Sequence, residues 1–129
     1  MAIFKKDLIV SVDDLDDLNH VNNVRYVQWI QDISKEHWQA KATEQMQEET
    51  IWVVLSHHIE YKTAAVLNDP ITMTTFIASS SGAKSTRVVE MRNRKTKKIL
   101  VRSSTEWCLL NSKTYRPVRI PDEIKDIFL

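Results

Sequence analysis

Residues 22–39 have the sequence NNVRYVQWIQDISKEHWQ, and this stretch decides the fold because its periodicity is that of a long helix. From Val24 to Trp38, polar side chains recur at three-to-four spacing along a narrow stripe, and the apolar ones are Val24, Tyr26, Val27, Trp29, Ile30, Ile33 and Trp38. The stripe consists of Arg25, Gln28, Asp32, Lys35 and Gln39. We therefore expect a helix over 24–38 that is largely buried. Asn22 or Asn23 is a suitable N-cap for this helix.

The rest of the chain shows the period-two alternation of strands. The expected strands cover 7–12, 51–62, 71–78, 85–93 and 98–110, and 122–129 could add a helical turn or two. Strands joined by short turns usually pair antiparallel. The sequence thus predicts an α+β fold in which an antiparallel sheet of about five strands packs on one long central helix. No linker or repeat is visible, so we expect a single domain over 1–129.

The composition excludes several functions. The chain has 129 residues and a net charge of +1, which provides no general field for nucleic acid. Its longest strongly apolar run, Ile51–Leu55, is far shorter than the roughly 20 residues of a membrane span. Gly82 is the only glycine, whereas a dinucleotide fingerprint needs three and a P-loop two. We expect no cofactor.

Cys108 is the only cysteine, so no intrachain disulfide can form. We expect its thiol in the core.

No apolar segment follows Lys5 and Lys6, so we do not expect a secretion signal. We expect the protein in the cytoplasm. His57 and His58 are adjacent on a strand and point to opposite faces, which argues against a shared metal ion. We expect no metal site.

The segment 14–23, Asp-Leu-Asp-Asp-Leu-Asn-His-Val-Asn-Asn, contains the candidate chemistry. It places three carboxylates, three amides and a histidine immediately before the apolar helix. A helix start presents unpaired N–H groups that attract an anion, including the oxyanion of a tetrahedral intermediate. A nearby carboxylate could attack the same carbonyl or activate water. The alternative is structural, because Asp and Asn are also common in turns and N-caps.

The pattern Asp-x-Asp-x-x-x-His-Val-Asn-Asn-x-x-Tyr, which starts at Asp14, resembles the hotdog thioesterases. It is most similar to acyl-CoA and acyl-carrier-protein (ACP) thioesterases of the 4-hydroxybenzoyl-CoA thioesterase branch. Supporting similarities lie at Glu60-Tyr61, at Thr105-Glu106-Trp107 and in the tail 116–124. The resemblance implies a hotdog fold and hydrolysis of an acyl-CoA or acyl-ACP thioester.

The resemblance also implies roles for individual residues. Asp16 corresponds to the family's general base or nucleophile, and the N–H of Asn23 to its carbonyl-polarising donor. His20 is a further catalytic candidate, although it could instead brace the turn. Asn22 and Tyr26 are candidates for substrate binding, with packing as the alternative for Tyr26. Asp14 is expected to serve structure.

Lys84 and Ser85 resemble the family's contact region for the pantetheine arm. A basic cluster follows at Arg92, Arg94, Lys95, Lys97 and Lys98. It is either a solvated hairpin tip or a docking site for the phosphates of coenzyme A or for an acidic carrier protein. The resemblance further implies a homodimer or homotetramer.

Some positions depart from the family. Leu18 stands where plant acyl-ACP thioesterases carry Asn, and their Cys and Glu near the second strand's end are absent. Asn19 replaces a glycine that is frequent in bacterial relatives, and Asn tolerates the left-handed backbone better than most residues. The alternatives to a thioesterase are a non-catalytic acyl-binding module and a hotdog hydratase or dehydratase, which the motif fits poorly.

Overall fold

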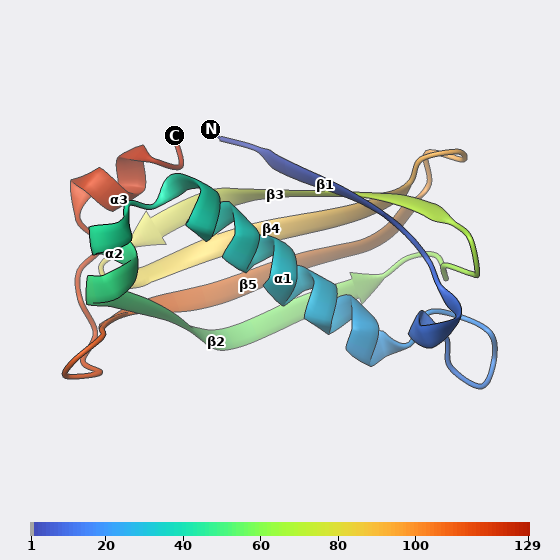
Figure 1. Cartoon of the computed structure of the whole chain (residues 1–129), viewed down its shortest axis with the longest axis horizontal. Coiled ribbons are helices and arrows are strands. Elements are labelled where there is room, and N and C mark those ends of the chain that lie inside the picture. The colour runs from blue at the N-terminus through green and yellow to red at the C-terminus, as the bar shows by residue number, and fades with distance from the viewer. Residues whose placement is uncertain (1) are drawn as a thin grey trace.

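The computed structural model describes residues 2–129 and places a long helix, α1 (Asn23–Lys41), against a five-stranded sheet (Figure 1). The strands are β1 (Phe4–Ile9), β2 (Thr50–Tyr61), β3 (Pro70–Ser81), β4 (Lys84–Asn93) and β5 (Ile99–Asn111). Their order in the sheet is β1-β3-β4-β5-β2, and every pairing is antiparallel. The α+β architecture expected from the sequence is confirmed, with β1 and β2 as the sheet edges.

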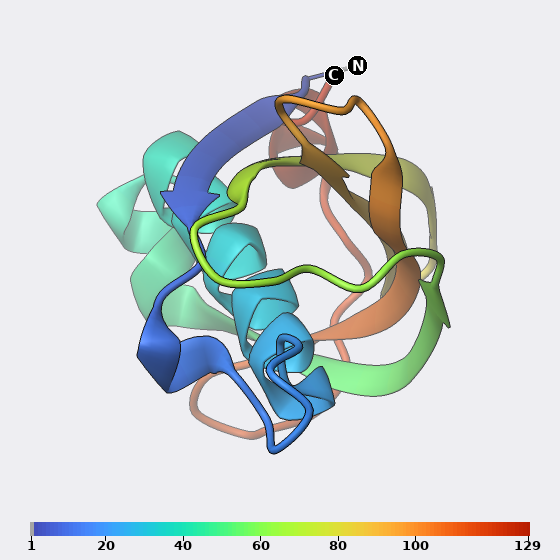
Figure 2. The same ribbon diagram turned by 90° about the vertical axis from the view of Figure 1, so that its right-hand side faces the viewer.

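The sheet curves partly around α1, which Figure 2 shows along the helix axis. Register shifts at Val54/Ser56 in β2 and Ile77/Ser79 in β3 interrupt the ladders. Such bulges bend a strand and increase its twist. The curvature lets several strands contact the same face of the helix.

Only one face of α1 is buried. Tyr26, Ile30 and Ile33 pack into the core, where the sheet contributes Ile71, Met73, Val89, Met91 and Val101. The prediction of a largely buried helix is wrong, since Val24, for example, is 73% exposed. The physical reason is that a single sheet layer covers only one side of the helix.

β1 lies three residues earlier than expected. The alternation of Leu8, Val10 and Val12 predicted a strand over 7–12, but Val12 belongs to a short 3-10 helix (Val12–Asp14). Pairing of β1 with β3 ends at Ile9, opposite Pro70, because the chain then turns toward the start of α1. The other strands match their predicted ranges to within three residues.

Two short helices, α2 (Glu44–Glu49) and α3 (Asp122–Asp126), lie near the C-terminal end of α1 (Figure 1). Ile124 and Phe128 form a second apolar cluster with Leu109 of β5 and with Trp38 and Trp52. Cys108 is buried, as expected. The two ends of α1 therefore have different surroundings: loops at its start, and a small aromatic cluster near its end.

Candidate active site

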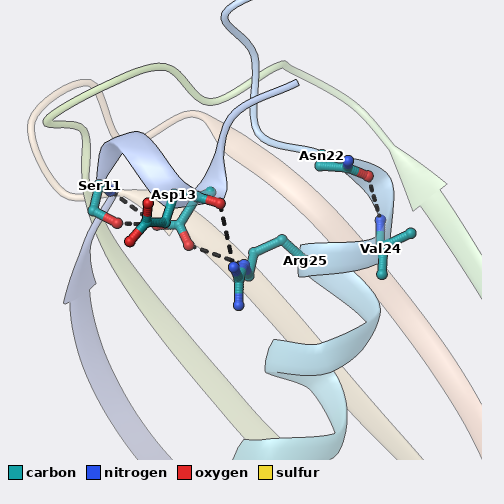
Figure 3. A network of polar contacts seen from close by, with 6 residues as sticks. Ser11, Asp13, Asn22, Val24 and Arg25 are labelled. Atoms are coloured by element: carbon teal, nitrogen blue, oxygen red, sulfur yellow. Dashed lines mark hydrogen bonds and ion pairs between the residues drawn. The ribbon is translucent and has the colours of Figure 1, made fainter. Parts of the chain in front are cut away.

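The loop before α1 is tied to the first turn of the helix. Asp14 accepts hydrogen bonds from the backbone N–H and hydroxyl of Ser11 at 2.8 and 3.2 Å. Its other oxygen lies 3.0 Å from Nε of Arg25, whose Nη2 also donates to the carbonyl of Asp13. Figure 3 shows the guanidinium reaching back to this turn. Asp14 thus has the structural role expected of it and fixes the loop two residues before Asp16.

Asp16 lies in a tight loop that its own side chain organises. Its Oδ1 accepts hydrogen bonds from the N–H groups of Leu18 at 2.9 Å and His20 at 3.1 Å, and its N–H donates to the His20 carbonyl at 2.7 Å. Asn19 adopts the left-handed conformation that this loop requires, with φ of 59°. Among residues 2–129, Oδ2 of Asp16 has no hydrogen-bond partner. One carboxylate oxygen is therefore held by the loop, and the other makes no hydrogen bond in this part of the chain.

The start of α1 leaves a backbone donor unused. Asn22 is the N-cap, and its side-chain oxygen accepts from the N–H of Val24 at 3.0 Å (Figure 3). The Asn22 N–H donates to the carbonyl of Asp14 at 2.9 Å. The N–H of Asn23, between them, has no acceptor within the described part of the chain. A free N–H at the positive end of a helix suits a developing oxyanion.

Asp16 and Asn23 line the same small cleft, which has a volume of about 190 Å³. His20 and Tyr26 lie in its wall as well, so four of the predicted site residues come together. The backbone of His20 braces the turn, while its exposed side chain lines the cleft. Asn22 acts as the cap just outside.

The hydroxyl of Tyr26 accepts a hydrogen bond from the N–H of Ala65 at 3.1 Å. Only 3% of Tyr26 is exposed. Burial is the main reason why the pKa of Tyr26 is raised, and nearby Tyr61, Asp69 and Asp16 raise it further. The phenol therefore stays protonated at neutral pH, where it packs and can donate a proton in a hydrogen bond.

Sequence reasoning assigned no role to the part of the cleft lining that comes from the end of β2. Tyr61 and Lys62 line the cleft there, and Lys62 pairs with Glu60 at 2.7 Å. Tyr61 belongs to the Glu60-Tyr61 similarity to the family, but that similarity carried no role, and no motif marks Lys62. Both residues reach the site because β2 runs past the start of α1 in three dimensions.

Lys84 and Ser85 lie at the other end of the molecule, at the start of β4 (Figure 1). Within one chain they are not brought to the Asp16 cleft. Lys84 is exposed and lies 4.0 Å from Glu106, whereas Ser85 lines a larger groove of about 610 Å³. This groove runs between the C-terminal half of α1 and the sheet, and it shares no lining residue with the cleft.

Over residues 2–129, no three His, Cys, Asp or Glu side chains are grouped so that they could hold a metal ion. In the same part of the chain, no helix is long and apolar enough to cross a membrane.

Residues 1–128 match the family model described as the acyl-ACP thioesterase N-terminal domain. The chain belongs to this family. It is 29% identical over 85 residues to the chloroplastic acyl-[acyl-carrier-protein] hydrolase FATB3 of Cuphea viscosissima, and 28% over 86 residues to the chloroplastic palmitoyl-ACP thioesterase of Cuphea hookeriana. These matches cover 66% and 67% of this chain but 21% of each relative. The chain therefore spans about a fifth of the length of the curated relatives it matches.

Solved structures of thioesterases share this family member's fold. The probable thioesterase YbaW from Escherichia coli superposes with a TM-score of 0.86 at 19% identity, over 95% of this chain and 94% of that one. The 12:0-ACP thioesterase from Umbellularia californica superposes with a TM-score of 0.85 at 21% identity, over 98% of this chain and 51% of that one. At such identities the likeness establishes the fold alone, and the hotdog fold implied by the motif is confirmed.

Proposed function

We propose that this protein hydrolyses an acyl thioester of coenzyme A or of acyl-carrier protein in the Asp16 cleft. One observation carries the proposal: a carboxylate oxygen of Asp16 and the N–H of Asn23, both without protein partners in residues 2–129, border the same cleft. Membership of the acyl-ACP thioesterase family supports the same reaction.

In the proposed reaction, the thioester carbonyl oxygen lies against the N–H of Asn23. Asp16 removes a proton from water, the resulting hydroxide adds to the carbonyl carbon, and the negative charge moves to the carbonyl oxygen. The N–H and the helix dipole stabilise this oxyanion more than the neutral carbonyl, so they act in the transition state. When the intermediate collapses, the C–S bond breaks and the proton held by Asp16 passes to the leaving thiolate.

A covalent route fits the same geometry. Asp16 would attack the carbonyl carbon itself, expel the thiolate and form a mixed anhydride that water then cleaves. A single turnover in ¹⁸O-labelled water identifies the covalent route when water attacks the Asp16 carbonyl of the anhydride. The general-base route puts the label only into the free acid, whereas attack of water at the Asp16 carbonyl of the anhydride puts it into Asp16, which mass spectrometry detects.

The decisive test is thiol release from a panel of acyl-CoA and acyl-ACP substrates by the wild type and by Asp16→Asn. We expect the variant to lose about a hundredfold or more, which corresponds to roughly 2.7 kcal/mol of barrier. Asp17→Asn is the matched control, because Asp17 is an exposed neighbour whose side chain makes no hydrogen bond in the described structure. Equal activity of wild type and Asp16→Asn would remove Asp16 from the mechanism.

The same panel addresses the other functions. Tight binding of acyl-CoA without thiol release would identify a non-catalytic acyl-binding module. Hydration of an enoyl-CoA without thiol release would identify a hydratase. Either result overturns the proposed hydrolysis.

We also propose that the protein forms a homodimer, or a homotetramer of two such dimers, in the cytoplasm. β2 supports the assembly, because it is a twelve-residue edge strand with Leu55 and Tyr61 each 48% exposed. Long uncovered edges readily pair with another strand. Light scattering after gel filtration gives the mass directly, and a monomer at micromolar concentration contradicts the assembly.

A further inference from the structure

The larger groove contains a buried cation that no carboxylate neutralises. Arg87, on β4, is only 5% exposed. Its Nη1 donates to the hydroxyl of Thr75 at 3.0 Å and to Nδ1 of His37 at 2.9 Å, and its guanidinium carbon lies 5.5 Å from the Phe128 ring centre. Within residues 2–129, no acidic side chain forms an ion pair with it. A buried, unpaired charge is costly and rare unless it has a use.

The charge on Arg87 persists at neutral pH. Burial lowers the pKa of Arg87 to about 10, so the guanidinium stays protonated. Its partner His37 is neutral, because burial and the nearby Arg87 lower the pKa of His37 to about 4. Since Nδ1 of His37 accepts from Arg87, the imidazole proton is on Nε2. Neither partner therefore offers a negative charge.

Arg87 has hydrogen-bonding capacity left. A guanidinium carries five N–H groups in a planar fork, and the hydrogen bonds to Thr75 and His37 both use Nη1. Nε and Nη2 have no acceptor in the part of the chain that the structure describes. An edge with unused parallel N–H groups is the arrangement that binds a carboxylate with two hydrogen bonds.

The groove around Arg87 has apolar walls and positive charge. Its volume of about 610 Å³ falls in the usual range for small-molecule sites. The apolar side chains in its wall include Trp38, Trp52, Val54, Ile77, Trp107 and Phe128. Among residues 2–129, the charged residues that line it are Lys35 and Arg87, with no Asp or Glu. The chemistry therefore fits a long apolar ligand that carries an anion.

We propose that this groove binds an acyl group with a carboxylate at its distal end, and that Arg87 anchors that carboxylate. The inference rests on the proposed thioesterase function, because it assigns the substrate class of that activity: half-thioesters of long dicarboxylic acids. Unsubstituted fatty acyl thioesters would contact the same apolar walls of the groove but would leave the Arg87 guanidinium without an anion.

The position of Arg87 sets the length of the chain. Asn23 and His37 are separated by about 21 Å along α1, at about 1.5 Å per residue. An extended chain advances about 1.2 Å per bond, as judged from the span of a three-bond peptide residue. At that advance the 21 Å correspond to about 17 bonds, so an acyl group of roughly eighteen carbons reaches from the start of α1 to the level of Arg87.

The first arm of the test measures binding without any catalysis. Calorimetric titration compares dodecanoate with dodecan-1-ol, which has the same chain without the charge. We expect dodecanoate to bind about tenfold tighter or more, which is the ratio one charged hydrogen bond supplies. Arg87→Met should remove this preference and Arg87→Lys should restore part of it. Arg102→Met, an exposed arginine of β5, is the matched control and should keep it.

The second arm measures kcat/KM for 17-carboxyheptadecanoyl-CoA and octadecanoyl-CoA. The wild type should prefer the carboxylated substrate by about tenfold, and Arg87→Met should lose the preference. Melting temperatures of all variants establish that they fold. Because Arg87→Met also removes the donor to His37, Arg87→Lys tests the charge in a variant that retains a donor.

The outcomes separate the two proposals. If dodecanoate shows no Arg87-dependent preference, the anion site is wrong whether or not thioesters are hydrolysed. If it shows the preference but the two CoA substrates react equally, the groove binds a free fatty acid and the assignment to the substrate is wrong. If no thioester is hydrolysed but the preference holds, the proposed function fails and the anion site stands.

Discussion

The two ends of α1 differ in how far apart in the sequence their contacts lie. At its start, the side-chain hydrogen bonds that shape the Asp16 loop and cap the helix join residues two to four positions apart. Longer contacts brace this loop from outside, from Arg25 back to Asp13 over 12 positions and from Tyr26 to Ala65 over 39. Toward its end, Arg87 is held by Thr75 and His37, which lie 12 and 50 positions away. The groups proposed to react are therefore held mainly by local hydrogen bonds, whereas the groove depends on the packing of the helix on the sheet. The proposed chemistry and the proposed specificity can be disturbed separately.

The largest effect should come from Asp16→Asn, which we expect to lower kcat by about a hundredfold or more. The same variant should bind dodecanoate as the wild type does, because the cleft and the groove share no lining residue. Thiol release and calorimetry measure the two properties on one protein sample. A variant that loses both properties would show that Asp16 also supports the binding of the chain in the groove.

A second large effect is expected in the pH dependence of the free energy of unfolding, through His37 beside the groove. The pKa of His37 is about 4 in the fold and 6.5 in the unfolded chain, so the unfolded state takes up the proton first. Stability is therefore lost as pH falls from about 6.5 to about 4, by about 3 kcal/mol for this residue. Urea unfolding across this range should show a flatter profile for His37→Gln.

His58→Gln is the control for that measurement, because His58 is exposed on β2. It should keep the wild-type slope. If His37→Gln and the wild type lose stability in parallel, His37 is not held neutral by the fold.

A smaller effect is expected at the helix start. Replacing the N-cap, Asn22→Ala, should lower the free energy of unfolding by about 1 kcal/mol, and Asn22→Ser should recover most of it. Thiol release should fall with Asn22→Ala as the first turn frays around the Asn23 N–H, while dodecanoate binding stays unchanged. Reduced dodecanoate binding would mean that the two ends of α1 are coupled.

The smallest effect is expected at Asn19, whose φ is 59°. Glycine adopts this conformation without steric cost, so Asn19→Gly should change the free energy of unfolding by a few tenths of a kcal/mol. Asn19→Ala should cost more, about 1 kcal/mol, because its Cβ disfavours the left-handed backbone. Thermal unfolding of both variants checks the order, and equal melting temperatures would contradict the role of the turn.

Much of the architecture was predictable because periodicity is a local property. The alternation in β2 to β5 and the helical spacing of α1 placed each element to within three residues. The resemblance to the hotdog thioesterases pointed to Asp16, His20 and Asn23, and the structure brings these three residues to one cleft. The end of β1 was missed because the apolar alternation continues to Val12 after pairing has stopped.

The far wall of the cleft and the cation of the groove were not predicted. The Glu60-Tyr61 similarity gave Tyr61 no role, and no motif marks Lys62. Both residues line the cleft because β2 passes the helix start. A weak signal for Arg87 did exist. Arg87 alternates in register with Val89 and Met91 on the inward side of β4, and His37 lies on the inward face of α1 with Ile33. A charged residue at an inward-facing position is unusual and indicates a buried polar site.

The sequence by itself determined which segments become helix and strands, and it placed Asp16 seven residues before Asn23 in a loop that closes on its own backbone. Hydrogen bonds over two to four residues are encoded locally, so a motif records them. Only the tertiary structure decided that β2 completes the cleft and that Arg87 is buried against His37 without an acid. Such contacts arise when the curved sheet folds over the helix, and the residues involved are too distant in sequence for any spacing rule to join them.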